Sequence, residues 1–170
     1  TIFYNGNGAT GGTTPDNGSQ VTGAAYTVAS NASASNPLVK TGFTFAGWNT
    51  NANGTGTDYA EGATGLATTS NVTLFAKWTA ASFAVTYVTG DGASAAPTQS
   101  NTMYGARFDL PSAPTRSGFN FLGWEVGSGS SATLYAPGPS YTMGSSSVTF
   151  TAKWSGLSYV VVYLLNGGSG

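Results

Sequence analysis

The sequence predicts a mostly β chain that contains two tandem repeat units and the first strand of a third. Apolar and polar residues alternate over short runs, which is typical of half-buried strands. The same motifs also recur at a fixed distance along the chain, and such internal repeats indicate repeated structural units. No segment combines a 3.6-residue apolar period with capping residues, so long helices are not expected.

Two paired motifs define the repeat. Residues 41–48 (TGFTFAGW) return as residues 117–124 (SGFNFLGW), and residues 72–78 (VTLFAKW) return as residues 148–154 (VTFTAKW). Both pairs are 76 positions apart. Because separate motifs share one offset, each unit is expected to fold in the same way.

Upstream of these motifs the offset changes. Residues 23–28 match residues 105–110 at an offset of 82, so the first unit contains six additional residues. They fall around Ala29 to Pro37, where Ala, Ser and Asn dominate, and this composition predicts a loop insertion. The segments 24–34 and 111–116 could each hold one helical turn.

The start of each unit is marked by a tyrosine. Tyr4 aligns with Tyr87 and then with Tyr163, and each follows a β-branched residue by two positions. The predicted domains are therefore 1–79 as the first unit, 80–155 as the second, and 156–170 as the opening strand of a third unit or a pairing strand.

The strands of a unit can be placed in order. Residues 2–8 open the first unit, Phe43 and Phe45 flank a short strand after Gly42, and residues 72–78 place alternate apolar side chains on one face. Asn-Gly dipeptides separate these runs, and they favour turns because both residues tolerate positive φ.

The C-terminal run YVVVYLL is apolar on both faces, unlike the mixed strand at residues 83–88. Alone it would form an exposed strand edge. One interpretation is that the chain ends inside the third repeat. The other is that the run adds to a sheet in this chain or in a neighbouring subunit. The candidate strand-addition residues are Tyr159, Val160, Val161, Val162, Tyr163, Leu164 and Leu165.

Composition excludes several classes of function. The chain has no His and no Cys, which removes most metal sites, His-based triads and thiol nucleophiles. Charged residues make up 6% and the net charge is −1, which argues against binding to nucleic acid or to an anionic membrane surface. No apolar run is long enough to span a bilayer. Abundant Gly, Ser, Thr and Asn are more typical of a secreted bacterial surface.

Catalytic and metal-binding candidates are weak. Asp58 and Glu61 could form a carboxylate pair, but their counterparts in the second unit are Leu134 and Pro137. Residues 49–54 (NTNANG) resemble the start of a calcium loop, but the early ligands are neutral and a polar hairpin loop is favoured. Lys77 and Lys153, which could form isopeptide crosslinks, should face solvent. We therefore expect no catalytic residue, no metal site and no cofactor.

Aromatic residues are expected mainly in the core. The four tryptophans occupy equivalent positions in both units, and burying such side chains stabilises each unit by roughly 2–3 kcal/mol apiece. Tyr59, Tyr135 and Tyr141 lie on segments that look like loops. They are therefore the candidate ligand-contact residues.

The motifs G-F-x-F-x-G-W and V-T-[LF]-x-A-K-W resemble the Listeria–Bacteroides repeat family, also called the internalin B-repeat, over essentially the whole chain. The resemblance implies small β-grasp-like modules in tandem on secreted or wall-attached bacterial proteins, with no catalytic residues to carry over. Two features depart from the family. The insertion is long, and the basic residues before the Gly-aromatic motif reduce to Lys40 and Arg116, which argues against polyanion binding.

The expected function is a non-catalytic extracellular stalk, spacer or adhesive segment. Its expected partners are a surface protein or glycan of a host or neighbouring cell, or further copies of the chain. Two alternatives stay open. One is a filament subunit assembled by strand addition through the C-terminal run, and the other is a carbohydrate-binding module.

Overall fold

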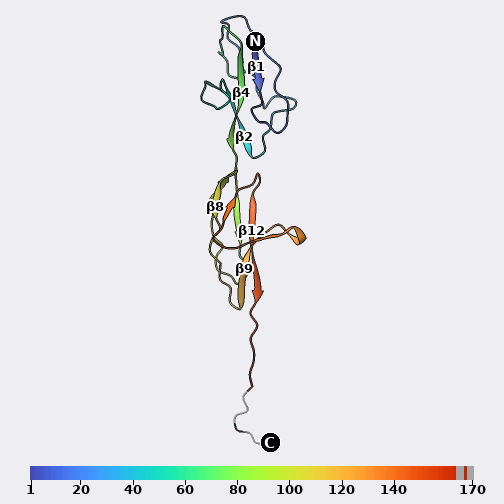
Figure 1. The fold of residues 1–170 in the computed structure, drawn as a ribbon, viewed down its shortest axis with the longest axis vertical. Coiled ribbons are helices and arrows are strands. Elements are labelled where there is room, and N and C mark those ends of the chain that lie inside the picture. Colours follow the sequence, from blue (N-terminus) through green and yellow to red (C-terminus); the bar gives the residue numbers. More distant parts are fainter. Residues whose placement is uncertain (164–166, 168–170) are drawn as a thin grey trace. The chain divides into compact units, whose positions relative to one another are not determined.

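The computed structural model describes residues 1–163 and residue 167 (Figure 1). Nearly all regular structure is β, which confirms the predicted mostly β class. The described chain divides into two compact units. The first comprises residues 1–83, 102–106 and 143–146, and the second comprises the rest.

The first unit contains a four-stranded sheet with the order β1-β4-β2-β3. Its strands are β1 (Ile2–Asn5), β2 (Phe43–Asn49), β3 (Asp58–Tyr59) and β4 (Val72–Ala80). β4 pairs in parallel with β1 and antiparallel with β2, so the first and last strands of the sheet are neighbours. A small antiparallel pair, β5 (Ser82–Phe83) with β7 (Thr102–Met103), also lies in this unit.

The second unit repeats the arrangement with the order β10-β9-β12-β6. Its strands are β6 (Val85–Val88), β9 (Phe119–Val126), β10 (Thr133–Tyr135) and β12 (Val148–Gly156). β6 is parallel to β12, as β1 is to β4. A second pair joins β8 (Arg107–Asp109) to β11 (Ser140–Thr142).

The glycine of the repeated Gly-Trp motif forms a bulge. Between Phe45 and Trp48 the pairing of β2 with β4 shifts register. Gly47 lies there with φ +110°, and a Cβ at this position would come within 2.6 Å of the Tyr59 carbonyl oxygen. Gly123 repeats the feature with φ +150°. Only glycine fits both the conformation and the close approach.

Each unit has its own aromatic core. Trp48 and Trp124 are both fully buried, as predicted, and their indole N–H groups donate to the carbonyl oxygens of Ala29 and Pro111. The other two tryptophans, Trp78 and Trp154, are half-buried. The remaining buried core residues of the first unit are Ile2, Tyr4, Val28, Leu38, Leu66, Leu74 and Ala76.

The predicted insertion is a loop that one side chain closes. The amide of buried Asn31 donates to the Leu38 carbonyl oxygen at 3.0 Å, and its Oδ1 accepts the Leu38 N–H at 2.7 Å. Neither segment 24–34 nor segment 111–116 forms the helical turn that its sequence allowed. Among the described residues the only helix is a 3-10 turn at Gly129–Ser131. The more specific likeness to a β-grasp fold stays a prediction.

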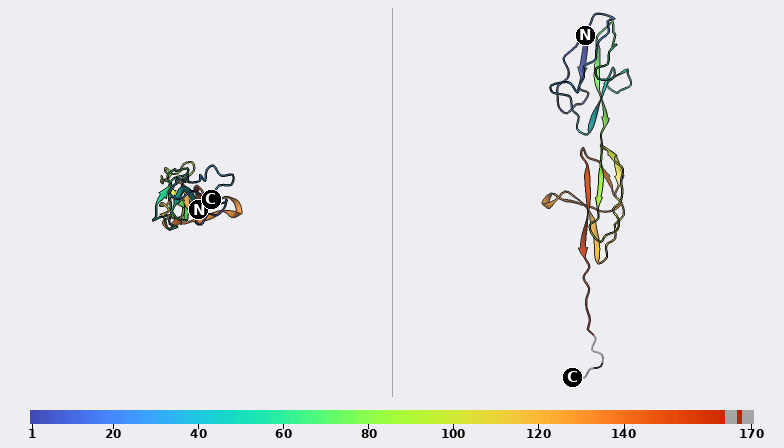
Figure 2. Two further views of the ribbon diagram at one scale, coloured as in Figure 1. Left: turned by 90° about the horizontal axis from the view of Figure 1, so that it is seen from above. Right: turned by 180° about the vertical axis from the view of Figure 1, so that it is seen from behind.

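The described part of the C-terminal run forms no strand. Residues 157–163 continue from β12 without sheet pairing, as Figure 2 also shows. The side chains of residues 159–163 are 71–90% exposed. Leu164 and Leu165, the last two residues of the predicted strand, lie outside the described residues. The described part of the apolar run therefore pairs with no described strand.

Candidate functional site

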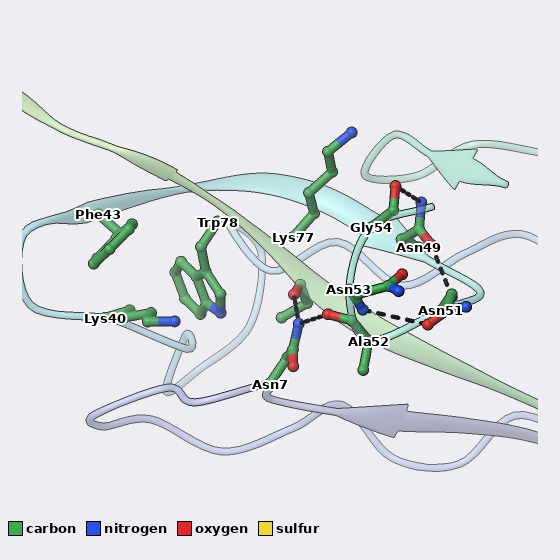
Figure 3. A pocket seen from close by; sticks show the side chains of 11 residues that line it. Asn7, Lys40, Phe43, Asn49, Asn51, Ala52, Asn53, Gly54, Lys77 and Trp78 are labelled. Carbon is green, nitrogen blue, oxygen red and sulfur yellow. Dashed lines mark hydrogen bonds between the residues drawn. The ribbon is translucent and has the colours of Figure 1, made fainter. Parts of the chain in front are cut away.

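A polar groove opens on the first unit between the turn that follows β1, the β2–β3 loop and the strand β4 (Figure 3). Its volume is about 300 Å³. We call it the amide groove because asparagine side chains dominate its lining. It is lined by Asn7, Lys40, Phe43, Asn49, Asn51, Ala52, Asn53, Gly54, Ala76, Lys77 and Trp78.

Asn7 builds one wall of the amide groove. It has φ +47°, a left-handed conformation that asparagine tolerates better than most residues. Its amide nitrogen donates to the carbonyl oxygens of Ala52 at 2.8 Å and Ala76 at 2.9 Å. These two bonds fasten the turn to the β2–β3 loop and to β4. The Asn7 Oδ1 accepts no hydrogen bond from any described residue.

Successive asparagines build the part of the lining that the β2–β3 loop provides. Buried Asn49 accepts the N–H of Asn51 at 2.7 Å, Asn51 accepts that of Asn53 at 3.3 Å, and Asn53 accepts that of Thr55 at 3.0 Å. These are Asx turns, in which the side-chain oxygen bonds the backbone two residues on.

The Asx turns bear on the calcium hypothesis for this loop. Its side-chain oxygens already accept backbone N–H groups, and it is a polar hairpin loop between β2 and β3. Across the described residues there is no group of three acidic, His or Cys side chains that could hold a metal ion. The amide nitrogens of Asn51 and Asn53, by contrast, have no described partner and can donate to a ligand.

An aromatic ring and a cation lie toward the other end of the amide groove. The Trp78 indole is held by a hydrogen bond from Nε1 to the Gly6 carbonyl oxygen at 3.1 Å and by edge contact with Phe45. The Lys40 ammonium lies 4.8 Å from the centre of the Phe43 ring, a cation–π contact. No described carboxylate pairs with Lys40.

Two carboxylates of the first unit, Asp58 and Glu61, serve structural contacts. Asp58 pairs with Lys77 and accepts the Asn49 amide at 2.6 Å. The Lys77 ammonium, followed by the Asn49 amide, lowers the pKa of the Asp58 carboxyl. Glu61 instead accepts the N–H of Ala32 at 2.7 Å. Asp58 therefore bonds residues of β2 and β4, whereas Glu61 bonds the inserted loop.

The predicted ligand-contact tyrosines lie elsewhere, and their expected loop placement is wrong. Tyr59 is in β3, Tyr135 in β10 and Tyr141 in β11, and all three are half-buried. The rings of Tyr135 and Tyr141 are 5.4 Å apart and both contact Phe150. Burial raises the pKa of the Tyr141 phenol. None of the three lines the amide groove, and a ligand contact by them stays a prediction.

The second unit repeats the cation–π pair and the tryptophan of the groove but not its asparagine side chains. Arg116 lies 4.1 Å from the Phe119 ring centre, and the Trp154 indole donates to the Thr89 carbonyl oxygen at 3.0 Å. Lys153 pairs with Glu125. The positions that correspond to Asn7, Asn51 and Asn53 are Gly90, Gly127 and Gly129.

The amide groove is not apparent in the sequence, although some of its parts are. The Asn-Gly turns and the 49–54 loop were visible as separate signals. Their juxtaposition depends on the parallel pairing of β1 with β4, which carries the turn at Asn7 to the loop after β2. No local pattern encodes that pairing.

Comparison with known proteins places the chain in a family. The family model of the Listeria-Bacteroides repeat domain matches residues 1–77 and 83–153. A protein of Evansella cellulosilytica named "Putative Gly-rich membrane protein" is 30% identical over 139 residues, which cover 78% of this chain and 16% of that protein. A second protein of this organism, named "Putative membrane protein", is 32% identical over 88 residues, 50% of this chain and 13% of that protein.

The chain thus spans less than a fifth of either relative. No solved structure is significantly similar to it. Among the described residues, no helix has the length and apolar character needed to cross a membrane. Two consecutive matches to one family model agree with the internal repeat in sequence and in structure. The chain belongs to the Listeria-Bacteroides repeat family.

Proposed function

We propose that the chain is a non-catalytic extracellular segment that serves as a stalk, spacer or adhesive part of a bacterial surface protein. The family assignment and the names of two much longer relatives support a surface or membrane-associated setting. The sparse charge and the structural use of Asp58 and Glu61 support a scaffold rather than an enzyme.

The parallel pairing of first and last strands is the observation that carries this proposal. In the first unit Ile2 lies opposite Val72 and Asn5 lies opposite Phe75. Tension on the chain enters at the start of β1 and leaves at the end of β4, which are opposite ends of this parallel pair. The inter-strand hydrogen bonds are therefore loaded together in shear and must break together.

The second unit has the same geometry, with Val85 opposite Val148 and Val88 opposite Thr151. Side chains strengthen the corresponding turns. Trp78 donates to the carbonyl oxygen of Gly6, just after β1, and Trp154 donates to that of Thr89, just after β6. Sliding of the first strand along the last must break these bonds as well. A tandem array of such units would resist extension.

Single-molecule force spectroscopy tests the stalk role. Because the chain has no native Cys, pulling handles can be placed with Thr1→Cys and Ala81→Cys, which load β1 against β4 in shear. The matched control uses Thr1→Cys and Asn71→Cys, which load the adjacent ends of the same two strands and peel them apart.

The first unit should unfold at a clearly higher force in the shear geometry than in the peeling geometry. Each released residue should add about 3.4 Å of contour length. Equal unfolding forces in the two geometries would overturn the proposal.

A filament subunit is the second candidate, favoured by the exposed apolar run. Residues 161–163 align with residues 2–4 of β1 and 85–87 of β6, yet residues 159–163 are 71–90% exposed and unpaired. Such a run could complete a sheet by strand addition to another copy.

Sedimentation analysis separates the two candidates. The samples are the intact chain, a chain truncated after Ser158, and the variant Val160→Lys with Val162→Lys. Assembly of the intact chain alone supports the filament. A monomer in all three samples eliminates it.

A further inference from the structure

We propose that the amide groove of the first unit binds a saccharide that carries a carboxylate group, such as a uronic acid residue. This inference goes beyond the mechanical role, and either can fail without the other. The groove volume of about 300 Å³ is at the lower end of the range for ligand pockets and is sufficient for a sugar ring.

A fixed aromatic ring supplies the apolar surface. Trp78 borders the groove, and its indole cannot rotate freely because Nε1 bonds to the Gly6 carbonyl oxygen and the ring meets the edge of Phe45. The C–H face of a pyranose ring is apolar and flat, so it packs well against such a ring. Binding to a ring that is already ordered also costs little conformational entropy.

Unused polar atoms supply the contacts for hydroxyl groups. The amide nitrogens of Asn51 and Asn53 can donate, and the Oδ1 of Asn7 can accept, because none of these atoms has a partner among the described residues. Sugar hydroxyls both donate and accept, so they match this mixed set.

The loop is also held in place before binding. Asn49 is 1% exposed, and its side chain bonds the backbone at both Asn51 and Gly56. The donors of the groove therefore belong to a loop that a ligand does not have to order.

The charge balance of the groove selects an acidic sugar. Two lysines line it, but Lys77 is paired with Asp58 while Lys40 has no described carboxylate partner. A ligand carboxylate could form a charge-assisted hydrogen bond with Lys40, which is stronger than a bond between neutral groups. A single free cation does not favour a highly charged polyanion, whose binding depends on many cations.

The second unit provides an internal control. It keeps the cation–π pair, here Arg116 with Phe119, and the bordering Trp154. Glycines replace the amide side chains, at Gly90, Gly127 and Gly129. Without the asparagine side chains, the second unit should bind acidic saccharides poorly. Binding should therefore be confined to the first unit.

Amide-resolved NMR titration of the intact chain tests the proposal. The probes are trigalacturonic acid and a hyaluronan tetrasaccharide. The methyl ester of trigalacturonic acid serves as a neutral control with the same sugar backbone. Shifts should appear at Asn51, Asn53 and the Trp78 indole N–H and should saturate for at least one acidic probe. The methyl ester should bind about tenfold more weakly.

Matched variants assign the contacts. Lys40→Met keeps the aliphatic stem of the side chain and should weaken binding of the acidic probe about tenfold, with little effect on the ester. The equivalent change in the second unit, Arg116→Met, should leave binding unchanged. Asn53→Gly copies the second unit at an exposed position and should also weaken binding.

Four results would overturn the proposal. They are the absence of shifts with both acidic probes at millimolar concentration, shifts of equal size in the second unit, an equal loss of affinity in Arg116→Met, and full competition by inorganic phosphate. The last result would show a general anion site rather than a saccharide site. Saturable shifts that are confined to the groove and depend on Lys40 would support the proposal.

Discussion

The hydroxyl of Tyr4 accepts a hydrogen bond from the backbone N–H of Ala29 at 2.8 Å. It also lies 3.4 Å from the hydroxyl of Tyr26, to which it can donate. In the second unit the equivalent hydroxyl of Tyr87 is buried and has no partner among the described residues. The same core tyrosine is therefore satisfied in one unit and unsatisfied in the other.

Two sequence differences explain this contrast. The residue that corresponds to Tyr26 is Phe108, which has no hydroxyl group, and the residue that corresponds to Ala29 is Pro111, which has no N–H. The correspondence is structural as well, since the buried tryptophan of each unit donates to the carbonyl oxygen of Ala29 or Pro111. A buried polar group without a partner costs free energy.

The tyrosine-to-phenylalanine change should therefore have opposite consequences in the two units. Tyr4→Phe should destabilise the first unit by about 1 kcal/mol, because it removes a made hydrogen bond and leaves the Ala29 N–H unpaired. Tyr87→Phe should leave the second unit unchanged or make it slightly more stable. NMR-detected urea unfolding, with separate probes in each unit, measures both effects. A loss of stability in Tyr87→Phe equal to that in Tyr4→Phe would contradict this account.

The same buried phenols should make the free energy of unfolding fall at alkaline pH. Burial is the largest cause that raises the pKa of Tyr4, and burial also raises the pKa of Tyr87. In the unfolded chain both phenols ionise near pH 10. Their contribution to stability is therefore complete below pH 10 and is lost as the pH rises toward the folded-state pKa.

The free energy of unfolding should thus fall more steeply above pH 10 in the wild type than in Tyr4→Phe, which has one fewer such phenol. Urea unfolding of the two proteins at a series of pH values from 8 to 11 measures the difference in slope. Parallel curves above pH 10 would show that the Tyr4 phenol ionises equally in both states.

Asn31 should be a strong determinant of stability in the insertion. Its side chain satisfies both the N–H and the carbonyl oxygen of Leu38, in a region where both residues are buried. Asn31→Ala should cost about 1–3 kcal/mol, because two buried backbone groups lose their partner. Asn36→Ala, an exposed change in the same loop, serves as the control and should cost less than about 0.5 kcal/mol. Thermal unfolding of both variants gives the comparison, and equal losses would reject this role.

Much of the fold was predictable because the sequences of the two repeat units can be compared with each other. The strands at Val72–Ala80 and Val148–Gly156 and the burial of Trp48 and Trp124 follow from alternation and equivalent position. The strand predicted at residues 159–165 does not form over its described part. A strand needs a partner as well as a suitable sequence, and residues 159–163 pair with no described strand.

The candidate site was less predictable for a related reason. Tyr59 and Tyr141 were expected on loops because their neighbours are small and polar, yet pairing with other strands and contact with aromatic rings override that local signal. The amide groove joins Asn7 to Ala52, which are 45 positions apart. Only the pairing of β1 with β4 brings them together, and local sequence patterns do not specify strand order.

The bulge glycine should be irreplaceable in both units. A Cβ at Gly47 or Gly123 would lie 2.6 or 2.8 Å from a carbonyl oxygen of the neighbouring strand, and both residues have positive φ. Gly47→Ala and Gly123→Ala should therefore each destabilise their own unit by about 3 kcal/mol. Gly156→Ala, in β12 with no atom within 4 Å of its added Cβ, should cost less than about 1 kcal/mol. Hydrogen exchange read separately for each unit should show faster exchange only in the unit that carries the bulge substitution. Exchange that stays at the wild-type rate would mean that the bulge tolerates a side chain and that the repeated Gly-Trp motif has another cause. Exchange that rises equally in both units would contradict the expectation that each bulge stabilises its own unit.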